Sequence, residues 1–323
     1  MPSLCLAPLR GLTDATFRTT FADNFPGFSD SIAPFLTTFQ GTKVKAAKLA
    51  DLLPENNPSL PVIPQIIGKD SKQFIVLATM LRDLGYETVN LNLGCPYPMV
   101  ANKGRGSGFL PFPDKLERFL DEIMAAPTRL SIKTRLGRRD AAEIIQLMPI
   151  FNRFPLSELI IHPRLGVQMY KGQVDLESFG QCLALSKNPV VYNGDIINLD
   201  SFSRLQQRFP EVNRWMIGRG ALANPFLPGQ ICQETPPLPP EPFVQLSLFH
   251  DQLFDLYGQR MQGPGHLLGR MKGLWFYLSQ PLAGGAKILK KIQKCKKIAE
   301  YQRLMAKLMA EPPAWQGLLG PGQ

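Results

Sequence analysis

A cysteine at a sharp bend is the residue in this sequence best placed to do chemistry. An apolar run over residues 88–93 predicts a short buried strand, which stops at Gly94-Cys95-Pro96. A glycine-rich run over residues 103–108 follows closely. Because active sites of parallel α/β proteins collect where the strands end, Cys95 is a candidate catalytic thiol. A buried core thiol is the alternative, since cysteine is often simply core.

Motifs that contain polar residues or glycine lie at the ends of nearly all the apolar runs of this sequence. In a barrel, the ends of these runs would converge on one mouth. In chain order they are Ala7-Pro8-Leu9, Gln65, Asn92, Lys133 with Arg135, His162 with Arg164, Asn193-Gly194-Asp195 and Gly218-Arg219-Gly220. The last two contain glycine loops, which predict a phosphate-binding cup of backbone N–H groups. Arg219 can add a charge-assisted hydrogen bond to such a cup.

Three further side chains have both a functional and a structural interpretation. Lys133 lies in an otherwise apolar run, which indicates an anionic partner: a carboxylate, or the reduced edge of a flavin ring. Gln65 suits the amide-like edge of the same ring, or it is a satisfied polar core residue. His162 is the only one of three histidines at an expected strand end. It is a candidate contact to phosphate or substrate, or a hydrogen-bonded scaffold residue.

Eight apolar runs of strand length alternate with helical patterns over the first 222 residues. The runs span residues 3–9, 30–35, 61–68, 88–94, 130–137, 158–164, 189–196 and 214–220. Helices are expected between them, most clearly over residues 71–84, and over residues 13–21 with Thr13 as N-cap. Eight βα repeats predict a (β/α)8 TIM barrel, an α/β fold, and an open doubly wound sheet is the alternative.

A proline-rich stretch divides the chain. Residues 234–242 contain five prolines in nine positions, which predicts a stiff linker. We therefore expect a catalytic barrel over residues 1–233 and a small all-helical domain over residues 243–310. Residues 311–323 are rich in Pro and Gly and are expected to be disordered.

Positive charge is concentrated in the C-terminal part. The net charge is +10 and the pI is near 9.4, which indicates a polyanionic partner. From Glu241 onward, 11 Lys+Arg stand against 5 Asp+Glu, so +6 of the charge lies there. An amphipathic helix expected over residues 287–309 carries lysines on one side. An ordinary solvated helix surface is the alternative interpretation.

Several classes of protein do not fit the composition. The five cysteines are widely spaced, and no Cys/His cluster indicates a metal site or a disulfide framework. No run reaches the ~18 apolar residues of a membrane span, and no signal peptide is evident. We expect a monomer in the reducing cytoplasm, with no membrane contact and no metal.

Six segments together resemble the tRNA-dihydrouridine synthase family of flavoenzymes. They are APLRGLTDATFR (7–18), VNLNLGCPYPMVANKGRGSGFL (89–110), SIKTRLG (131–137), LIIHPR (159–164), YNGDI (192–196) and MIGRGALANPFL (216–227). The resemblance implies an FMN-bound TIM barrel that uses NADPH to reduce the C5–C6 double bond of a uridine in tRNA. The basic helical part would bind the tRNA.

The resemblance also implies roles for individual residues. Hydride from flavin N5 would reach uracil C6, and Cys95 would protonate C5 as the general acid. The implied FMN ligands are Ala7, Pro8, Leu9, Gln65, Lys133, His162, Asn193, Gly194, Asp195, Gly218 and Arg219. The candidates for contacting the tRNA are Asn92, Arg135, Arg164, Arg270, Lys272, Lys287, Lys290, Lys291 and Lys294.

Two other functions are compatible with parts of the pattern. One is another FMN barrel acting on a small substrate, similar to dihydroorotate dehydrogenase or an ene-reductase. It does not explain the basic helical part or the Gly-Cys-Pro loop. The other is a barrel that binds RNA but has no catalytic activity. The presence of both Cys95 and Lys133 argues against this second function.

Overall fold

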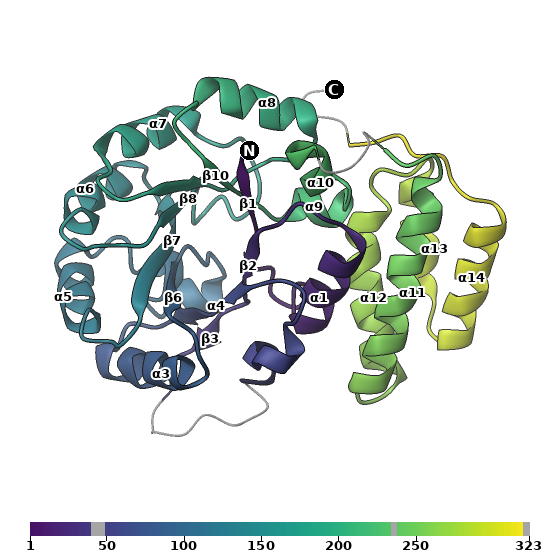
Figure 1. Cartoon of the computed structure of the whole chain (residues 1–323), viewed down its shortest axis with the longest axis horizontal. Helices are drawn as coiled ribbons and strands as arrows, with labels where there is room; N and C mark the ends of the chain where they lie inside the picture. The colour runs from purple at the N-terminus through teal and green to yellow at the C-terminus, as the bar shows by residue number, and fades with distance from the viewer. Residues whose placement is uncertain (40–48, 234–237, 319–323) are drawn as a thin grey trace.

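A computed structural model describes residues 1–39, 49–233 and 238–318 (Figure 1). A barrel of parallel strands is surrounded by helices, and a group of further helices lies beside it. The expected TIM barrel followed by a helical C-terminal region is therefore confirmed.

Ten strands in the described residues occupy the eight expected positions. They are β1 (Ser3–Leu6), β2 (Asp30–Ile32), β3 (Leu36–Thr37), β4 (Val62–Ile63), β5 (Gln65–Ile67), β6 (Thr88–Leu93), β7 (Arg129–Gly137), β8 (Leu159–Leu165), β9 (Val190–Tyr192) and β10 (Arg214–Ile217). Pro64 separates β4 from β5, because proline has no N–H to donate to the ladder. β2 pairs with β4 and β3 with β5, so these two positions close the ring between β1 and β6.

Helices cover the outside of the barrel. They are α1 (Ala15–Asn24), α3 (Ser71–Asp83), α4 (Pro98–Ala101), α5 (Pro113–Ile123), α6 (Ala142–Phe151), α7 (Leu176–Leu185), α8 (Leu199–Arg208), α9 (Arg219–Ala223) and α10 (Leu227–Cys232). α3 confirms the expected helix, with Asp70 as its N-cap. For α1 the expected cap was wrong: Asp14 accepts the N–H of Phe17, whereas Thr13 Oγ1 accepts the N–H of Leu9 at 2.8 Å.

The helical region contains α11 (Pro242–Arg260), α12 (Pro264–Leu278), α13 (Gly285–Lys294) and α14 (Ile298–Ala310). The single helix expected over residues 287–309 was wrong, since it breaks between α13 and α14. Lys272 Nζ donates to the carbonyls of Gln293 and Cys295, at 2.9 and 2.6 Å, and so ends α13. A side chain from a neighbouring helix thus decides where this helix stops.

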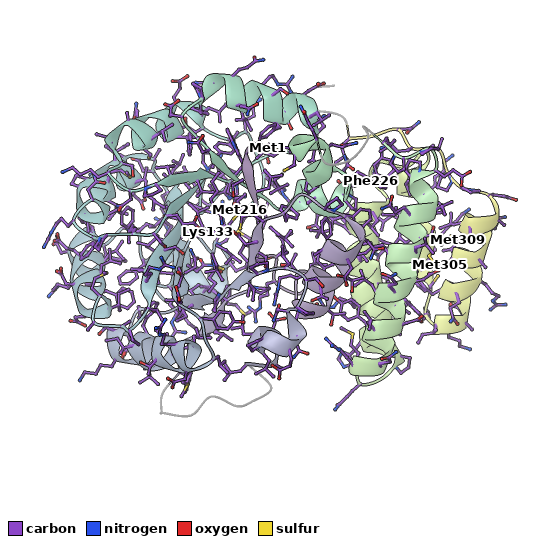
Figure 2. All side chains as sticks on the ribbon, viewed as in Figure 1. Met1, Lys133, Met216, Phe226, Met305 and Met309 are labelled. Carbon is purple, nitrogen blue, oxygen red and sulfur yellow. The ribbon has the colours of Figure 1, made fainter. Side chains whose placement is uncertain are left out.

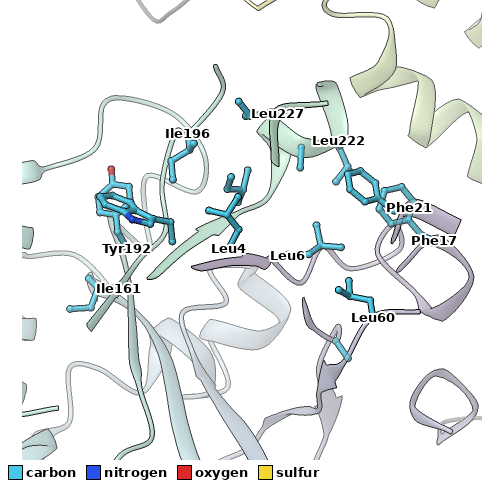
Figure 3. Packing of buried hydrophobic residues seen from close by; sticks show 14 of the residues in the cluster. Leu4, Leu6, Phe17, Phe21, Leu60, Ile161, Tyr192, Ile196, Leu222 and Leu227 are labelled. Atoms are coloured by element: carbon cyan, nitrogen blue, oxygen red, sulfur yellow. The ribbon is translucent and has the colours of Figure 1, made fainter. Parts of the chain in front are cut away.

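An aromatic cluster joins the helical region to the barrel. The Phe249 ring of α11 lies 5.1–6.0 Å, centroid to centroid, from Phe17, Phe21 and Phe25. Figure 3 shows Phe17, Phe21 and Leu222 in this part of the core. Burial of large rings on both sides makes this a core contact between the two parts of the chain.

The expectation of disorder after residue 310 was wrong for residues 311–318. Gln316 N donates to the Pro281 carbonyl at 2.7 Å, and the Trp315 ring lies edge-on to Phe226 at 5.5 Å. Packing of the partly buried tryptophan against the core offsets the flexibility that nearby Pro and Gly would otherwise confer. Residues 234–237 of the expected linker and residues 319–323 lie outside the described residues. Within the described residues, no helix combines the length and apolarity required to cross a membrane.

Candidate active site

The C-terminal ends of the strands bring many of the expected site residues to one mouth of the barrel. Parallel pairing aligns Asn92 of β6 with Lys133 of β7, and Arg135 of β7 with His162 of β8. Figure 2 labels Lys133 inside the barrel. Side chains that are far apart in sequence are therefore neighbours here.

Buried amides connect the floor of this mouth to the cysteine loop. Gln65 donates through Nε2 to Asn90 Oδ1 and accepts through Oε1 from Asn92 Nδ2, each at 2.7 Å. Asn92 Oδ1 accepts the backbone N–H groups of Gly94 and Cys95, at 3.0 and 2.9 Å. Asn92 therefore holds the bend that carries the cysteine, a positioning role that the sequence does not predict.

The Cys95 thiol is buried, with 8% of the residue's surface exposed. Burial raises its pKa, and the opposing effects of the Tyr97 backbone N–H, Arg135 and Arg10 do not offset this rise. Such a thiol keeps its proton at neutral pH. It is suited to donating a proton, and less suited to acting as a nucleophile.

The glycine-rich run packs directly onto the cysteine. Gly106 has a φ of +56°, and a Cβ there would lie 2.8 Å from the Cys95 carbonyl oxygen and 2.9 Å from its Cβ. Ser107 donates to the same carbonyl through its backbone N–H and its hydroxyl, at 3.1 and 3.0 Å. Only glycine fits position 106, and the loop holds Cys95 in place.

Lys133 is a buried cation without a carboxylate partner among the described residues. Its Nζ donates to Asn193 Oδ1 at 2.6 Å, and Asn193 Nδ2 donates to the Met216 carbonyl at 2.9 Å. Burial, with a further contribution from Arg135, lowers the pKa of Lys133 to about 7. Burial, with a smaller contribution from Arg164, lowers the pKa of Arg135 to about 10. Positive charge is therefore in excess around Lys133.

A single carboxylate serves two arginines beside Lys133. Asp195 forms ion pairs with Arg164 and, at 3.0 Å, with Arg219. Asp195 has a φ of +42°, the left-handed region that Asp tolerates better than most residues. His162 Nε2 lies 3.2 Å from Arg164 Nη1, and burial together with the surrounding cations lowers its pKa well below the usual value. His162 is therefore a neutral member of the cluster.

The glycine loops after β9 and β10 lie against the end of β1. A Cβ on Gly218 would lie 3.2 Å from the Cβ of Ala7, and one on Gly220 would lie 1.9 Å from the Ile196 carbonyl oxygen. The Ala7 N–H donates to the Ile217 carbonyl at 2.8 Å. This close approach of backbones places Ala7, Pro8 and Leu9 next to the expected phosphate cup, and Gly194 lies beside Pro163 in the adjoining loop.

Tyr170 is a site residue that the sequence did not single out. The guanidinium carbons of Arg135 and Arg219 lie 5.4 and 5.3 Å from the centroid of its ring. Burial raises the pKa of its hydroxyl. Tyr170 lies in the loop after β8, five residues before Asp175, the N-cap of α7. This loop has no apolar periodicity that would have predicted its structure.

The basic candidates of the helical region fall into two groups. Arg270 donates to the Gly11 carbonyl and forms a 3.0 Å ion pair with Asp14, so it joins α12 to the start of α1. Lys272 is used in ending α13. These two side chains bind within the chain, whereas the α13 lysines are exposed: Lys287, Lys290, Lys291 and Lys294. The exposed set remains the candidate surface for a polyanion.

Known proteins resemble this chain in both sequence and fold. It is 31% identical over 265 residues to a probable tRNA-dihydrouridine synthase from Helicobacter pylori, covering 79% of this chain and 78% of that one. A probable tRNA-dihydrouridine synthase from Rhodobacter capsulatus is 28% identical over 72% of this chain and 71% of its own length. A tRNA-dihydrouridine(16) synthase from Cupriavidus necator is 27% identical, over 70% of this chain and 72% of its own.

Among solved structures, morphinone reductase shares the barrel fold. The TM-score is 0.53 with 12% identity, over 75% of this chain and 88% of that one. The model of the family described as Dihydrouridine synthase (Dus) matches residues 5–262, which include the cysteine loop, the cationic mouth and the glycine loops. The chain belongs to the dihydrouridine synthase family.

Proposed function

We propose that this protein reduces the C5–C6 double bond of a uridine in tRNA to give 5,6-dihydrouridine, with FMN as cofactor and NADPH as electron donor. The observation that carries the proposal is the excess of positive charge at the mouth. Of Lys133, Arg135, Arg164 and Arg219, only Arg164 and Arg219 form an ion pair among the described residues, and both pair with the same carboxylate, Asp195. Buried cations are stable only with anionic partners, so this mouth fits a phosphorylated, electron-accepting ligand.

The residues present fit FMN at both ends of the molecule. The backbone of Gly218 and the guanidinium of Arg219 would hold the phosphate, beside Ala7, Pro8 and Leu9. Lys133, Asn193 and Gln65 would contact the ring edge. Asp195 orients Arg219 rather than contacting an anion, because its carboxylate is already occupied by two guanidinium groups. His162, being neutral, would donate or accept a hydrogen bond without adding charge.

Reduction of the double bond adds a hydride to C6 and a proton to C5. Bound FMN, after reduction by NADPH, supplies hydride chemistry of this kind. Cys95 delivers the proton, since its raised pKa keeps the thiol protonated until a more basic carbon appears. Asn92 and Gly106 hold that thiol in position. Arg135 and Tyr170 border the same opening and would orient the uracil.

The substrate must present its base in an unstacked form. A uracil within an RNA fold has to be extruded, which costs a few kcal/mol, roughly, and contacts to the RNA backbone must offset this cost. The exposed lysines of α13 supply such contacts. We further propose that the protein acts as a monomer in the cytoplasm, without a metal.

Purified protein tests the proposal directly. It should show a flavin absorbance spectrum, and with NADPH it should form dihydrouridine in tRNA that lacks this modification, detected by mass spectrometry of digested RNA. Turnover of a small free enone or dihydroorotate with no tRNA binding at low salt would instead favour the small-substrate barrel. A colourless protein that takes up no FMN but binds tRNA would favour the non-catalytic barrel.

A further inference from the structure

We propose that a second basic surface, on the barrel rim across the mouth from the helical region, binds the phosphate backbone of the RNA substrate. This barrel-rim patch consists of Lys69, Lys103, Arg105, Arg138 and Arg139. The inference rests on the proposed function and deepens it, because it says how the substrate is held on the side that α13 does not reach.

Three adjacent strands bring the five side chains together. Lys69 follows β5, Lys103 and Arg105 lie in the loop after β6, and Arg138 and Arg139 follow β7. A Cβ built on Gly104 would lie 3.9 Å from Lys69 Nζ, which places that ammonium over the loop after β6. Arg138 Nη2 donates to Asn102 Oδ1 at 2.7 Å, which ties the third loop to the second. The patch is therefore one continuous surface.

The cations of the patch do not form ion pairs with nearby acids of the described residues. In the part of the chain that the structure describes, none of the five side chains forms an ion pair. Asp70 accepts the backbone N–H of Gln73 as the cap of α3. Glu143 accepts backbone N–H groups of Arg138, Arg139 and Asp140. The neighbouring carboxylates are thus committed to the backbone.

One member of the patch also lacks a partner for a buried atom. Arg105 Nε is buried, and its N–H donates no hydrogen bond to the residues that the structure describes. Arg105 directly precedes Gly106, which packs on Cys95. An anion bound by Arg105 would therefore sit next to the loop that carries the proton donor.

The order of strands in the ring places the patch opposite the helical region. β6 and β10 lie on opposite sides of the ring, since β7, β8 and β9 separate them on one side and β1 with the two closing positions on the other. α12 packs against α9, directly after β10, and Arg270 of α12 donates to Gly11 after β1. A uridine entering the mouth thus has α13 on one flank and the patch on the other.

The arrangement suits an extended polyanion better than a dinucleotide. Lys69, Lys103 and Arg139 are exposed, and the five charges are spread over three loops. A nucleic-acid backbone carries a charge at every residue and is bound by such dispersed cations. NADPH carries its phosphates within one small molecule, and small ligands are usually bound in concave pockets.

Neutralising the exposed members tests the inference. The variant Lys69→Gln/Lys103→Gln/Arg139→Gln should bind tRNA about 10-fold more weakly at moderate salt, and its log–log salt slope should be shallower by about 2. The matched control is Arg82→Gln/Arg129→Gln/Lys187→Gln, three exposed cations at the opposite end of the barrel. The control should bind tRNA as the wild type does, and both variants should keep the wild-type KM for NADPH in flavin reduction.

The outcomes separate this inference from the proposed function. If the wild type binds tRNA and the rim variant binds as tightly as the control, the patch inference alone is wrong. If the rim variant has a raised KM for NADPH and an unchanged affinity for tRNA, the patch binds the dinucleotide, and the inference that it binds RNA is wrong. If the wild type itself neither binds nor reduces tRNA, the proposed function fails, and the inference fails with it.

Discussion

The two ends of the barrel hold buried charge in opposite ways. At the N-terminal ends of the strands, Arg214 donates to Asp30 and to Glu158, each at 2.8 Å, so one cation faces two carboxylates. At the mouth, Arg164 and Arg219 share Asp195, and the one partner of the Lys133 ammonium within the described residues is the amide oxygen of Asn193. At the closed end carboxylates outnumber the cation that pairs with them. At the mouth cations outnumber the carboxylate, so the mouth favours an anionic ligand. In a barrel, the first arrangement serves stability and the second serves function.

Each end also holds a buried cysteine with a raised pKa. Cys5 lies inside the barrel near Asp30, and burial is the main cause of its shift. Cys95 has the same main cause, but it sits on a loop whose backbone is held by Asn92 and Ser107. Burial alone therefore does not mark a catalytic thiol. The supporting hydrogen bonds and the cationic surroundings distinguish the two.

The largest expected difference is between two variants, each of which lacks one of these thiols. Cys95→Ala should lower the rate of dihydrouridine formation about 100- to 10,000-fold, the contribution typical of a general acid, while FMN binding and NADPH oxidation persist. Cys5→Ala, which removes a thiol that is fully buried, should leave the rate unchanged and only reduce thermal stability. Mass spectrometry of tRNA digests gives the rate. Wild-type turnover by the Cys95 variant would remove this residue from the mechanism.

The next effect concerns the cations at the two ends. Lys133→Gln should weaken binding of reduced FMN about 10- to 100-fold, since it removes a charge-assisted hydrogen bond, without lowering the melting temperature. Arg214→Met should do the reverse, costing about 3 kcal/mol of stability by leaving two buried carboxylates unpaired, with FMN binding retained. Anaerobic flavin titration and thermal melts measure the two quantities.

The pH dependence gives a sharper form of the same test. With a pKa of about 7 in the free protein, Lys133 is charged below pH 7 and loses its proton above it. Because an anionic ring edge binds the charged form, wild-type affinity for reduced FMN should fall by about tenfold per pH unit above 7, and Lys133→Gln should lose this slope. A slope that survives in the variant would show that another group is responsible.

The smallest effect is expected from substitution of the exposed α13 lysines. Water already solvates their charges, so each contact with RNA contributes little to the binding free energy. Lys290→Glu/Lys294→Glu should weaken tRNA binding several-fold with a shallower salt slope, about 1 per lost phosphate contact, while the flavin spectrum stays the same. Arg303→Glu/Lys307→Glu, on α14 at the far side of the helical region, is the control (Figure 1). Equal losses in both variants would mean that net charge, and not the α13 face, attracts the RNA.

The sequence predicted well wherever a local pattern decides the outcome. The eight apolar runs coincide with the eight strand positions, because buried strands require such runs and short turns separate them. Cys95, Lys133 and the glycine loops were placed at one mouth for the same reason, since parallel strands put all their C-terminal ends on one edge. Strand ends were less accurate: the run expected over residues 214–220 ends at Ile217, where α9 takes over.

What depends on contacts distant in sequence was not predictable. Lys272 of α12 donates to the carbonyl of Cys295 at the end of α13, and Arg270 forms an ion pair with Asp14. Two side chains that were expected to contact RNA therefore link parts of this chain. Tyr170 acquires its place from two arginines that lie 35 and 49 residues away in the sequence. Trp315 orders a segment whose composition predicted disorder. In each case a single side chain, with no periodic signature, decides the local structure.

The ordered segment after α14 has a consequence for which nucleotide is reduced. Asn198 of the barrel donates to the Leu318 carbonyl at 3.0 Å, and Trp315 packs on Phe226, so the helical region is fastened to the barrel at its far end as well as through Phe249. A region held at both ends keeps a fixed separation between the α13 lysines and the Cys95 thiol. Under the proposed function, this fixed separation would select the uridine that lies at that distance from the RNA backbone bound by α13.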